Sequence, residues 1–181
     1  MMEDLAMHMM EIIMNSVKAN SSLIKIFISS LSKTNETIIE IIDDGCGMDK
    51  EMLEKVTDPF TTSRTTRKVG LGVSFMKGLC ESCDGTFIMK SEVGKGTYLK
   101  ATIRKDHIDA PPLGDIGELI MISIQSNENI DYELVYIDDY NEFAFKSKTI
   151  KEELSGISLL EPEILLWIKE YINQEIRKER S

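Results

Sequence analysis

One short stretch, Asp43–Met48 (Asp-Asp-Gly-Cys-Gly-Met), constrains the fold of this chain more than any other. It follows the run 37–42, in which isoleucine predominates, and runs rich in β-branched residues are typical of buried strands. The two glycines predict a tight turn, and they allow the backbone to approach a flat or phosphorylated ligand closely. A carboxylate at this turn could accept a hydrogen bond from an exocyclic amine. Taken alone, the pattern also fits an ordinary turn at the end of a strand.

Composition narrows the class of protein. The chain has 181 residues, which suits one compact domain with or without a small appendage. No apolar run approaches the roughly 20 residues that cross a membrane, and residues 1–14 lack the basic start of a signal peptide. We therefore expect a cytoplasmic protein with no membrane contact.

Charge is distributed unevenly along the chain. The net charge is −10, and residues 111–181 hold 15 acidic and 7 basic side chains. A negative chain repels the phosphate backbone, so we expect no nucleic-acid partner. The acidic C-terminal part could instead bind a basic protein partner, or it could be a well-solvated surface.

The three cysteines are Cys46, Cys80 and Cys83. An odd number in a chain without an export signal argues against a disulfide framework. The single Cys-x-x-Cys pair would need further ligands to hold zinc or an iron–sulfur cluster. The pattern favours buried or half-buried thiols on a helix over a metal or redox site.

Hydrophobic periodicity and turn residues predict the order of the elements. A linker at 109–114, with paired prolines and a glycine, divides the chain into a domain over 1–108 and a small α+β appendage over 109–181. The segment 61–69 is rich in threonine and basic residues and predicts a mobile loop. Helices are expected at 2–19, 50–56, 73–82, 149–154 and 161–180, and strands at 23–30, 37–42, 86–90, 97–104, 119–125 and 132–137.

Four elements in a fixed order carry a family resemblance. They are the helix with Glu11 and Asn15, the Asp44–Gly47 turn, the loop ending at Gly70–Gly72, and Gly94–Thr97. Over about residues 5–105 the chain resembles the GHKL superfamily of ATP-binding domains, which includes gyrase B, Hsp90, sensor histidine kinases and MutL. The resemblance implies an α+β fold of the Bergerat type, in which a mixed sheet carries helices on one face and these form the ATP site.

The resemblance also implies roles for single residues, with ATP and Mg²⁺ as cofactors. Asn15 would ligate Mg²⁺, since an amide oxygen suits an octahedral shell completed by phosphates and water. Asp44 would accept from the adenine amino group, Gly47 would pass close to the base, and Thr97 would reach adenine, often through water. Gly70 and Gly72 would present backbone N–H groups to phosphates at a helix N-terminus. The implied cofactor-binding set is Asn15, Asp44, Gly47, Met48, Phe60, Thr65, Lys68, Gly70, Leu71, Gly72, Val73 and Thr97.

Glu11 lies one helical turn before Asn15. A carboxylate there could act as the general base on a water or on a hydroxyl nucleophile, or it could be an ordinary helix carboxylate favoured by the dipole. The segment 58–72 resembles an ATP lid that closes on the phosphates, with Phe60 as its hinge anchor. Arg64, Arg67 and Lys68 are its candidate cations for the γ-phosphate, and we expect one of them to make the contact.

Three functions fit this set of residues. The first is weak ATP hydrolysis, the second a serine/threonine kinase acting in trans as anti-sigma factors do, and the third an ATP-sensing module with little hydrolysis. The chain begins ten residues before Glu11, so we expect no phospho-accepting histidine helices ahead of it. Glu11, the lid and residues 107–115 also resemble a narrower group, the small bacterial stand-alone histidine kinase-like ATPases, some encoded near iron hydrogenases. A protein partner is expected, and a homodimer is possible.

Overall fold

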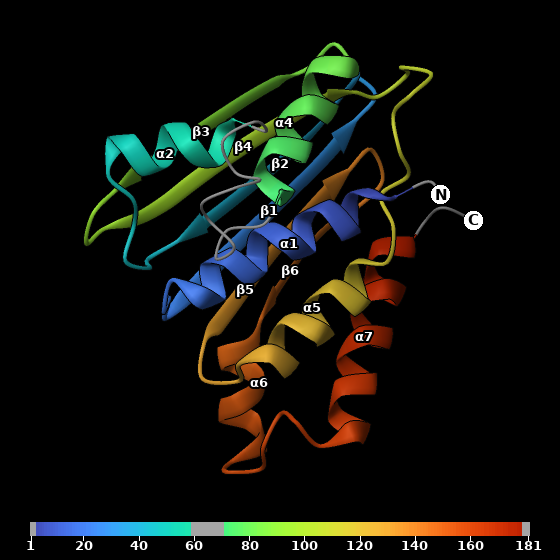
Figure 1. The fold of residues 1–181 in the computed structure, drawn as a ribbon. Helices are drawn as coiled ribbons and strands as arrows, with labels where there is room; N and C mark the ends of the chain where they lie inside the picture. The colour runs from blue at the N-terminus through green and yellow to red at the C-terminus, as the bar shows by residue number, and fades with distance from the viewer. Residues whose placement is uncertain (1–2, 59–70, 179–181) are drawn as a thin grey trace.

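The structure is a computed structural model that describes residues 3–58 and 71–178. Its centre is one six-stranded sheet with the strand order β3-β4-β2-β1-β5-β6 (Figure 1). The strands are β1 (Leu23–Leu31), β2 (Glu36–Asp43), β3 (Thr86–Glu92), β4 (Gly96–Arg104), β5 (Asp131–Asp138) and β6 (Glu142–Lys146). The helices are α1 (Leu5–Lys18), α2 (Lys50–Thr57), α4 (Gly72–Ser82), α5 (Ile116–Ser126), α6 (Ser147–Leu154) and α7 (Pro162–Arg177).

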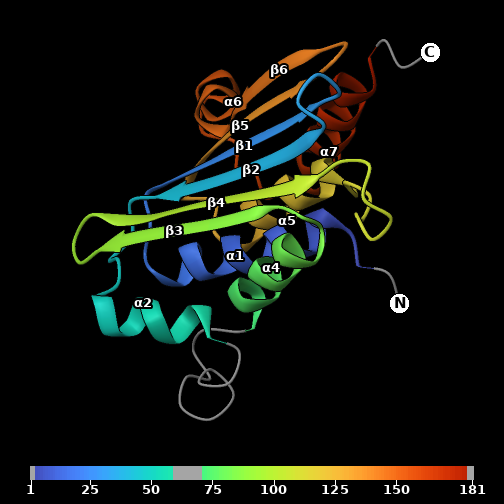
Figure 2. The same ribbon diagram turned by 90° about the horizontal axis from the view of Figure 1, so that it is seen from above.

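The sheet is mixed. Strand β1 pairs with β2 in antiparallel and with β5 in parallel orientation, and the remaining pairs are antiparallel. Figure 2 shows α1, α2 and α4 on the same side of the strands. Helix α5 packs on α1, and α7 packs on α5. The predicted fold class, an α+β sandwich with a mixed sheet and helices on one face, is confirmed.

The core lies between this face of the sheet and the helices. Side chains alternate along a strand, so every second residue of β1 and β2 points to one face. Ile26 of β1 lies opposite Ile41 of β2, and both are almost fully buried. Met9 and Ile13 of α1 have no exposed surface. This packing fixes α1 against the sheet, which positions the residues on the last turns of the helix.

The C-terminal part differs from the expectation at residues 119–125 and again at β6. The strand predicted at 119–125 is wrong, because these residues belong to helix α5. Its buried positions recur at helical spacing, and Asp115 caps it by accepting from the Glu118 N–H at 2.8 Å. The isoleucine-rich run suggested a strand, but a buried helix and a buried strand look alike in so short an apolar run.

Strands β5 and β6 extend the main sheet beyond β1, and β6 has no counterpart among the strands expected from the sequence. The sheet is therefore continuous across the linker at 109–114. The end of this linker is also bound to the start of α1, because the Leu5 N–H donates to the Pro112 carbonyl at 3.0 Å and the Ala6 N–H to the Leu113 carbonyl at 2.9 Å. The division into residues 1–108 and 109–181 stays a prediction.

Candidate functional site

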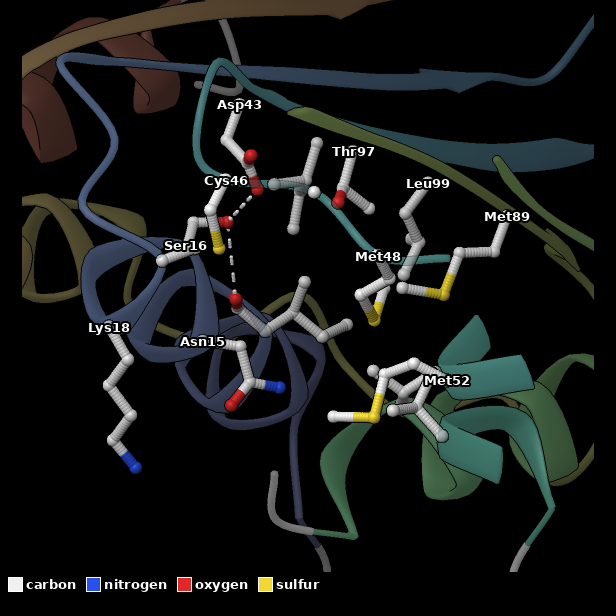
Figure 3. A pocket seen from close by; sticks show the side chains of 16 residues that line it. Asn15, Ser16, Lys18, Asp43, Cys46, Met48, Met52, Met89, Thr97 and Leu99 are labelled. Carbon is white, nitrogen blue, oxygen red and sulfur yellow. Dashed lines mark hydrogen bonds between the residues drawn. The ribbon is translucent and has the colours of Figure 1, made fainter. Parts of the chain in front are cut away.

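A cavity of about 560 Å³ lies among α1, α2, the start of α4 and the ends of β2 and β4. Figure 3 shows the polar side chains at one end, with Asn15, Ser16 and Lys18 on α1 and Asp43 and Thr97 on the sheet. The other walls are apolar and rich in sulfur. They are formed by Ile12, Ile41, Met48, Met52, Val56, Val73, Met89 and Leu99. A mostly apolar cavity with a few convergent polar groups is the usual form of a small-molecule site.

Helix α1 carries the polar end of this cavity. Asp4 caps the helix by accepting from the Met7 N–H at 2.9 Å, and the apolar face described above holds it on the sheet. Ile12, Asn15 and Ser16 all line the cavity. Their spacing of three and four residues places them on one side of the helix. Ser16 was absent from the residues predicted for the site, although this spacing could have identified it.

Asp43 is the acidic residue that the structure brings into the cavity. Its Oδ2 accepts a hydrogen bond from the Ser16 hydroxyl at 2.6 Å, and its Oδ1 accepts one from the Gly45 N–H at 3.0 Å. Asp43 is the register partner of Thr97 on the adjacent strand, so the two side chains come from neighbouring positions at the strand ends. A carboxylate oxygen has two lone pairs, so each oxygen keeps the capacity to accept a further hydrogen bond.

Asp44, the predicted ligand-binding acid, does not line the cavity. Its carboxylate accepts from the Ser22 N–H at 2.7 Å, from the Leu23 N–H at 3.0 Å and from the Ser22 hydroxyl. Successive side chains at a strand end point in opposite directions, so Asp43 and Asp44 cannot both face the cavity. Of the two acids, the structure therefore brings only Asp43 into the cavity. In the sequence, Asp43 is the acid from which the two glycines follow at the spacing Asp43-x-Gly45-x-Gly47, and this spacing could have identified it.

The hydrogen bonds of Asp44 give it a structural role at the start of β1. Burial by itself raises the pKa of Asp44, but the hydrogen bonds from the Ser22 side chain and from the Leu23 and Ser22 amides outweigh it. The pKa therefore lies below the ordinary value of 3.8. The ionised form stabilises the fold, and this contribution is present above the ordinary pKa and is lost as the pH falls through the folded-state pKa.

Replacing Asp44 with asparagine should destabilise the protein by about 1 kcal/mol at pH 7, because the charged acceptor of two backbone N–H groups is lost. The difference from wild type should shrink as the pH falls below about 4, because the unfolded chain takes up the proton first and the folded carboxylate follows at its lower pKa. Urea unfolding at pH 7 and pH 3 measures both values. An equal difference at the two pH values would show that the charge of Asp44 contributes nothing.

The turn after Asp43 is hydrogen-bonded both to the end of α1 and to the turn between β3 and β4. The Cys46 N–H donates to the Ala19 carbonyl at 2.9 Å, and the Cys46 carbonyl accepts from the Gly94 N–H at 2.8 Å. Gly47 lies on the cavity wall with φ of +69°, and a Cβ on it would lie 2.0 Å from the Glu92 carbonyl oxygen. Glycine is needed at 47 for its left-handed backbone and for close packing on the turn between β3 and β4.

Replacing Gly47 with alanine should destabilise the fold by about 2 kcal/mol or more, because the added Cβ meets backbone atoms while the residue holds a left-handed conformation. The shift of the urea midpoint measures this loss. Gly78, where an added Cβ meets nothing within 4 Å, is the matched control in helix α4. Alanine at 78 should not destabilise the protein, and an equal loss at both positions would contradict the packing argument.

Thr97 belongs to a small group of hydroxyls at the same end of the cavity. Its Oγ1 lies 2.8 Å from the Ser91 Oγ. Ser91 also accepts from the Met48 N–H at 2.8 Å and donates to the Gly96 carbonyl at 2.9 Å. Ser91 thus ties together Thr97 and Met48, two of the predicted site residues that do line the cavity.

Glu11 is exposed on α1, one turn before Asn15, and lies against the first residue of α4. An added Cβ on Gly72 would lie 2.6 Å from the Glu11 Cβ and 2.7 Å from its Oε2. Only glycine at 72 leaves room for this carboxylate beside the helix N-terminus. Leu71 is 38% exposed, whereas Val73 is buried and lines the cavity. The structure therefore brings Glu11 next to the Gly72 backbone, near the cavity but outside its lining.

Four of the predicted site residues, Phe60, Thr65, Lys68 and Gly70, lie outside the described residues. The candidate cations Arg64 and Arg67 lie outside them too. Their roles stay predictions.

The two cysteines of the Cys-x-x-Cys pair are buried, as the sequence favoured. Burial raises the pKa of the Cys80 thiol to about 11, which keeps it protonated and unreactive. Among residues 3–58 and 71–178, no group of three or more histidine, cysteine or acidic side chains is placed to hold a metal ion. Within the same residues, no helix has the length and apolar content that a membrane span requires.

Comparison with known proteins identifies the family of this chain. The family model described as "Histidine kinase-, DNA gyrase B-, and HSP90-like ATPase" matches residues 3–107. Among curated relatives, the sensor kinase CckA of Brucella abortus is 28% identical over 148 residues, which are 76% of this chain and 16% of that protein. The sensor histidine kinase YclK of Bacillus subtilis is 38% identical over 78 residues, 40% of this chain and 16% of that one. The chain thus spans about a sixth of the length of these relatives.

Among solved structures, the Aquifex aeolicus MutL ATPase domain complexed with ADP is similar to this chain with a TM-score of 0.48 and 16% identity. The similarity covers 85% of this chain and 68% of that one. The family model spans more than half of the chain, and its match begins before α1 and ends after β4, so it includes every described element around the cavity. This protein therefore belongs to the histidine kinase-, DNA gyrase B- and HSP90-like ATPase family, the GHKL superfamily that its motifs resembled.

Proposed function

We propose that this protein binds ATP with Mg²⁺ in the cavity and hydrolyses it slowly. One observation carries the proposal: Asn15, Asp43 and Thr97, from three separate elements, line a single cavity, and Glu11 lies one helical turn from Asn15. The family assignment supports the choice of nucleotide.

The adenine ring fits the inner part of the cavity by its chemistry. Asp43 keeps free lone pairs beside its two hydrogen bonds, so it can accept from the exocyclic amino group of adenine. Met48, Met89 and Leu99 supply apolar walls for the faces of the base. Thioether groups make favourable contacts with aromatic rings, which suits a flat base.

Asn15 fits a role in holding Mg²⁺. Its amide oxygen is the kind of ligand that Mg²⁺ accepts, and its side chain lines the cavity on the same helix as Glu11. When bound, Mg²⁺ neutralises part of the charge on the phosphates. The N-terminus of α4 adds a favourable dipole and backbone N–H groups on the side where Glu11 lies.

Glu11 would act as the general base. Its carboxylate would take the proton of a water that attacks the γ-phosphorus, while the bond from that phosphorus to the oxygen shared with the β-phosphate breaks and ADP leaves. The same carboxylate could take the proton of a serine or threonine hydroxyl. For this reason Glu11 alone does not separate an ATPase from a kinase.

A protein kinase acting in trans is the second candidate, since the curated relatives that share this segment carry the name sensor kinase. Incubating the protein and a cell extract with γ-labelled ATP separates the candidates. Free phosphate without labelled protein supports the ATPase, and a labelled protein band supports the kinase. Neither product supports an ATP-sensing module that acts through partner binding, for which the acidic segment 111–181 or a second copy of the chain would be the contact.

A further inference from the structure

We infer that Ser16 is a positioning residue that sets the preference for adenine by fixing the carboxylate of Asp43. The inference rests on the proposed function and deepens it. Ser16 would touch no nucleotide atom and would act only through Asp43.

The Ser16 hydroxyl makes its shortest hydrogen bond to the carboxylate of Asp43. It is 4% exposed on the last turn of α1, and its hydroxyl lies 2.6 Å from the Asp43 Oδ2 (Figure 3). The other acceptor in reach, the Ile12 carbonyl one turn earlier, lies 3.5 Å away. A hydroxyl has one proton, and the much shorter distance assigns it to the carboxylate.

The two hydrogen bonds on Asp43 come from different parts of the molecule. Ser16 belongs to helix α1, whereas the Gly45 N–H belongs to the turn that follows β2. Two donors on the two oxygens fix the plane of the carboxylate, which a single donor would leave free to rotate. The remaining lone pairs then keep one direction toward the cavity.

This arrangement distinguishes purines by their group at position 6. Adenine carries an amino group there, which donates to a carboxylate, whereas guanine carries a carbonyl oxygen, which a carboxylate repels. Ser16 has already given its proton to Asp43, so it has none to offer to a guanine carbonyl. A site that recognises a donor by hydrogen bonding rejects the analogue that lacks it.

Ser21 supplies a matched control. It is also a buried serine, 5% exposed, and its hydroxyl donates at 2.7 Å to the backbone carbonyl of Ser16. It therefore supports the end of α1 without touching the Asp43 carboxylate. Removing it should disturb the fold locally and leave the preference among purines unchanged.

The test compares the affinities of ATP and of purine riboside triphosphate, which lacks the amino group at position 6. Ser16→Ala should weaken ATP about 10-fold, equivalent to about 1.4 kcal/mol, and purine riboside triphosphate less than about 2-fold. Ser16→Thr, which keeps the hydroxyl, should restore most of the ATP affinity. Ser21→Ala should change both nucleotides by the same factor. If Ser16→Ala folds poorly, Ser16→Cys, with its weak S–H donor, should show a smaller loss confined to ATP.

An equal loss for both nucleotides in the Ser16 variants, or no loss for either, would overturn the inference while leaving ATP binding intact. Failure of the wild-type protein to bind ATP is a different result. It would overturn the proposed function, and the inference with it.

Discussion

Replacing Asp43 with asparagine should lower the affinity for ATP·Mg²⁺ by about 30-fold or more, equivalent to about 2 kcal/mol. Both oxygens of Asp43 accept a hydrogen bond from the protein, one from Ser16 and one from Gly45. An amide has only one acceptor oxygen, so asparagine must turn its NH₂ group toward one of these donors. The charge that attracts the adenine amino group is lost as well. Titration calorimetry in millimolar Mg²⁺ measures the change.

Asp44→Asn is the control for this experiment, because Asp44 is the adjacent acid and binds Ser22 and Leu23 outside the cavity. It should change the ATP affinity by less than about 2-fold while lowering the stability by about 1 kcal/mol. If Asp44→Asn abolished binding and Asp43→Asn preserved it, the assignment of the adenine-binding acid would be wrong.

Replacing Glu11 with glutamine should reduce the rate of phosphate release about 100-fold and leave the affinity for ATP nearly unchanged. A positioned general base contributes about that factor or more, and glutamine keeps the shape but cannot take a proton. The contact of residue 11 with Gly72 should survive, because the side chains of glutamate and glutamine are nearly equal in size. A phosphate-release assay combined with a binding titration separates the two effects.

Glu81→Gln tests whether any helical glutamate matters in this assay. Glu81 is exposed near the end of α4, the opposite end of that helix from Gly72. Its replacement should leave both turnover and binding unchanged. Unchanged turnover in Glu11→Gln would remove Glu11 from the role of base, whereas loss of binding would make it a structural or ligand-contacting residue.

The local sequence pattern predicted the secondary structure of most of the first hundred residues. The helix with Glu11 and Asn15 has a clear apolar stripe, β1 alternates between apolar and polar residues over much of its length, and β2 is a run rich in isoleucine, so local pattern was enough to separate helix from strand. Helix α5 was missed because Ile120, Ile122 and Ile124 also fit a buried strand. Helix α7 packs on α5 but is distant from it in the sequence, so no local sequence pattern indicates this contact.

Several residues that the sequence predicted for the site line one cavity, whose role stays a prediction. Asn15, Gly47, Met48, Val73 and Thr97 all line the cavity, but the choice between Asp43 and Asp44 depended on which side chain of the strand end faces α1. Ser16 lies 27 residues before Asp43, and a contact over that distance depends on the packing of α1 against β2. Gly47 was predicted for ligand approach, whereas the structure shows that the Glu92 backbone also requires it.

The measurement that tests the central claim most directly is a calorimetric titration of the wild-type chain with ATP, once in millimolar Mg²⁺ and once in EDTA. We predict saturable binding of one ATP for each chain, weakened when Mg²⁺ is removed because Asn15 would then lose the ion that we propose it holds against the phosphates. No saturable binding of ATP in the presence of Mg²⁺ would contradict the claim that this cavity is a nucleotide site.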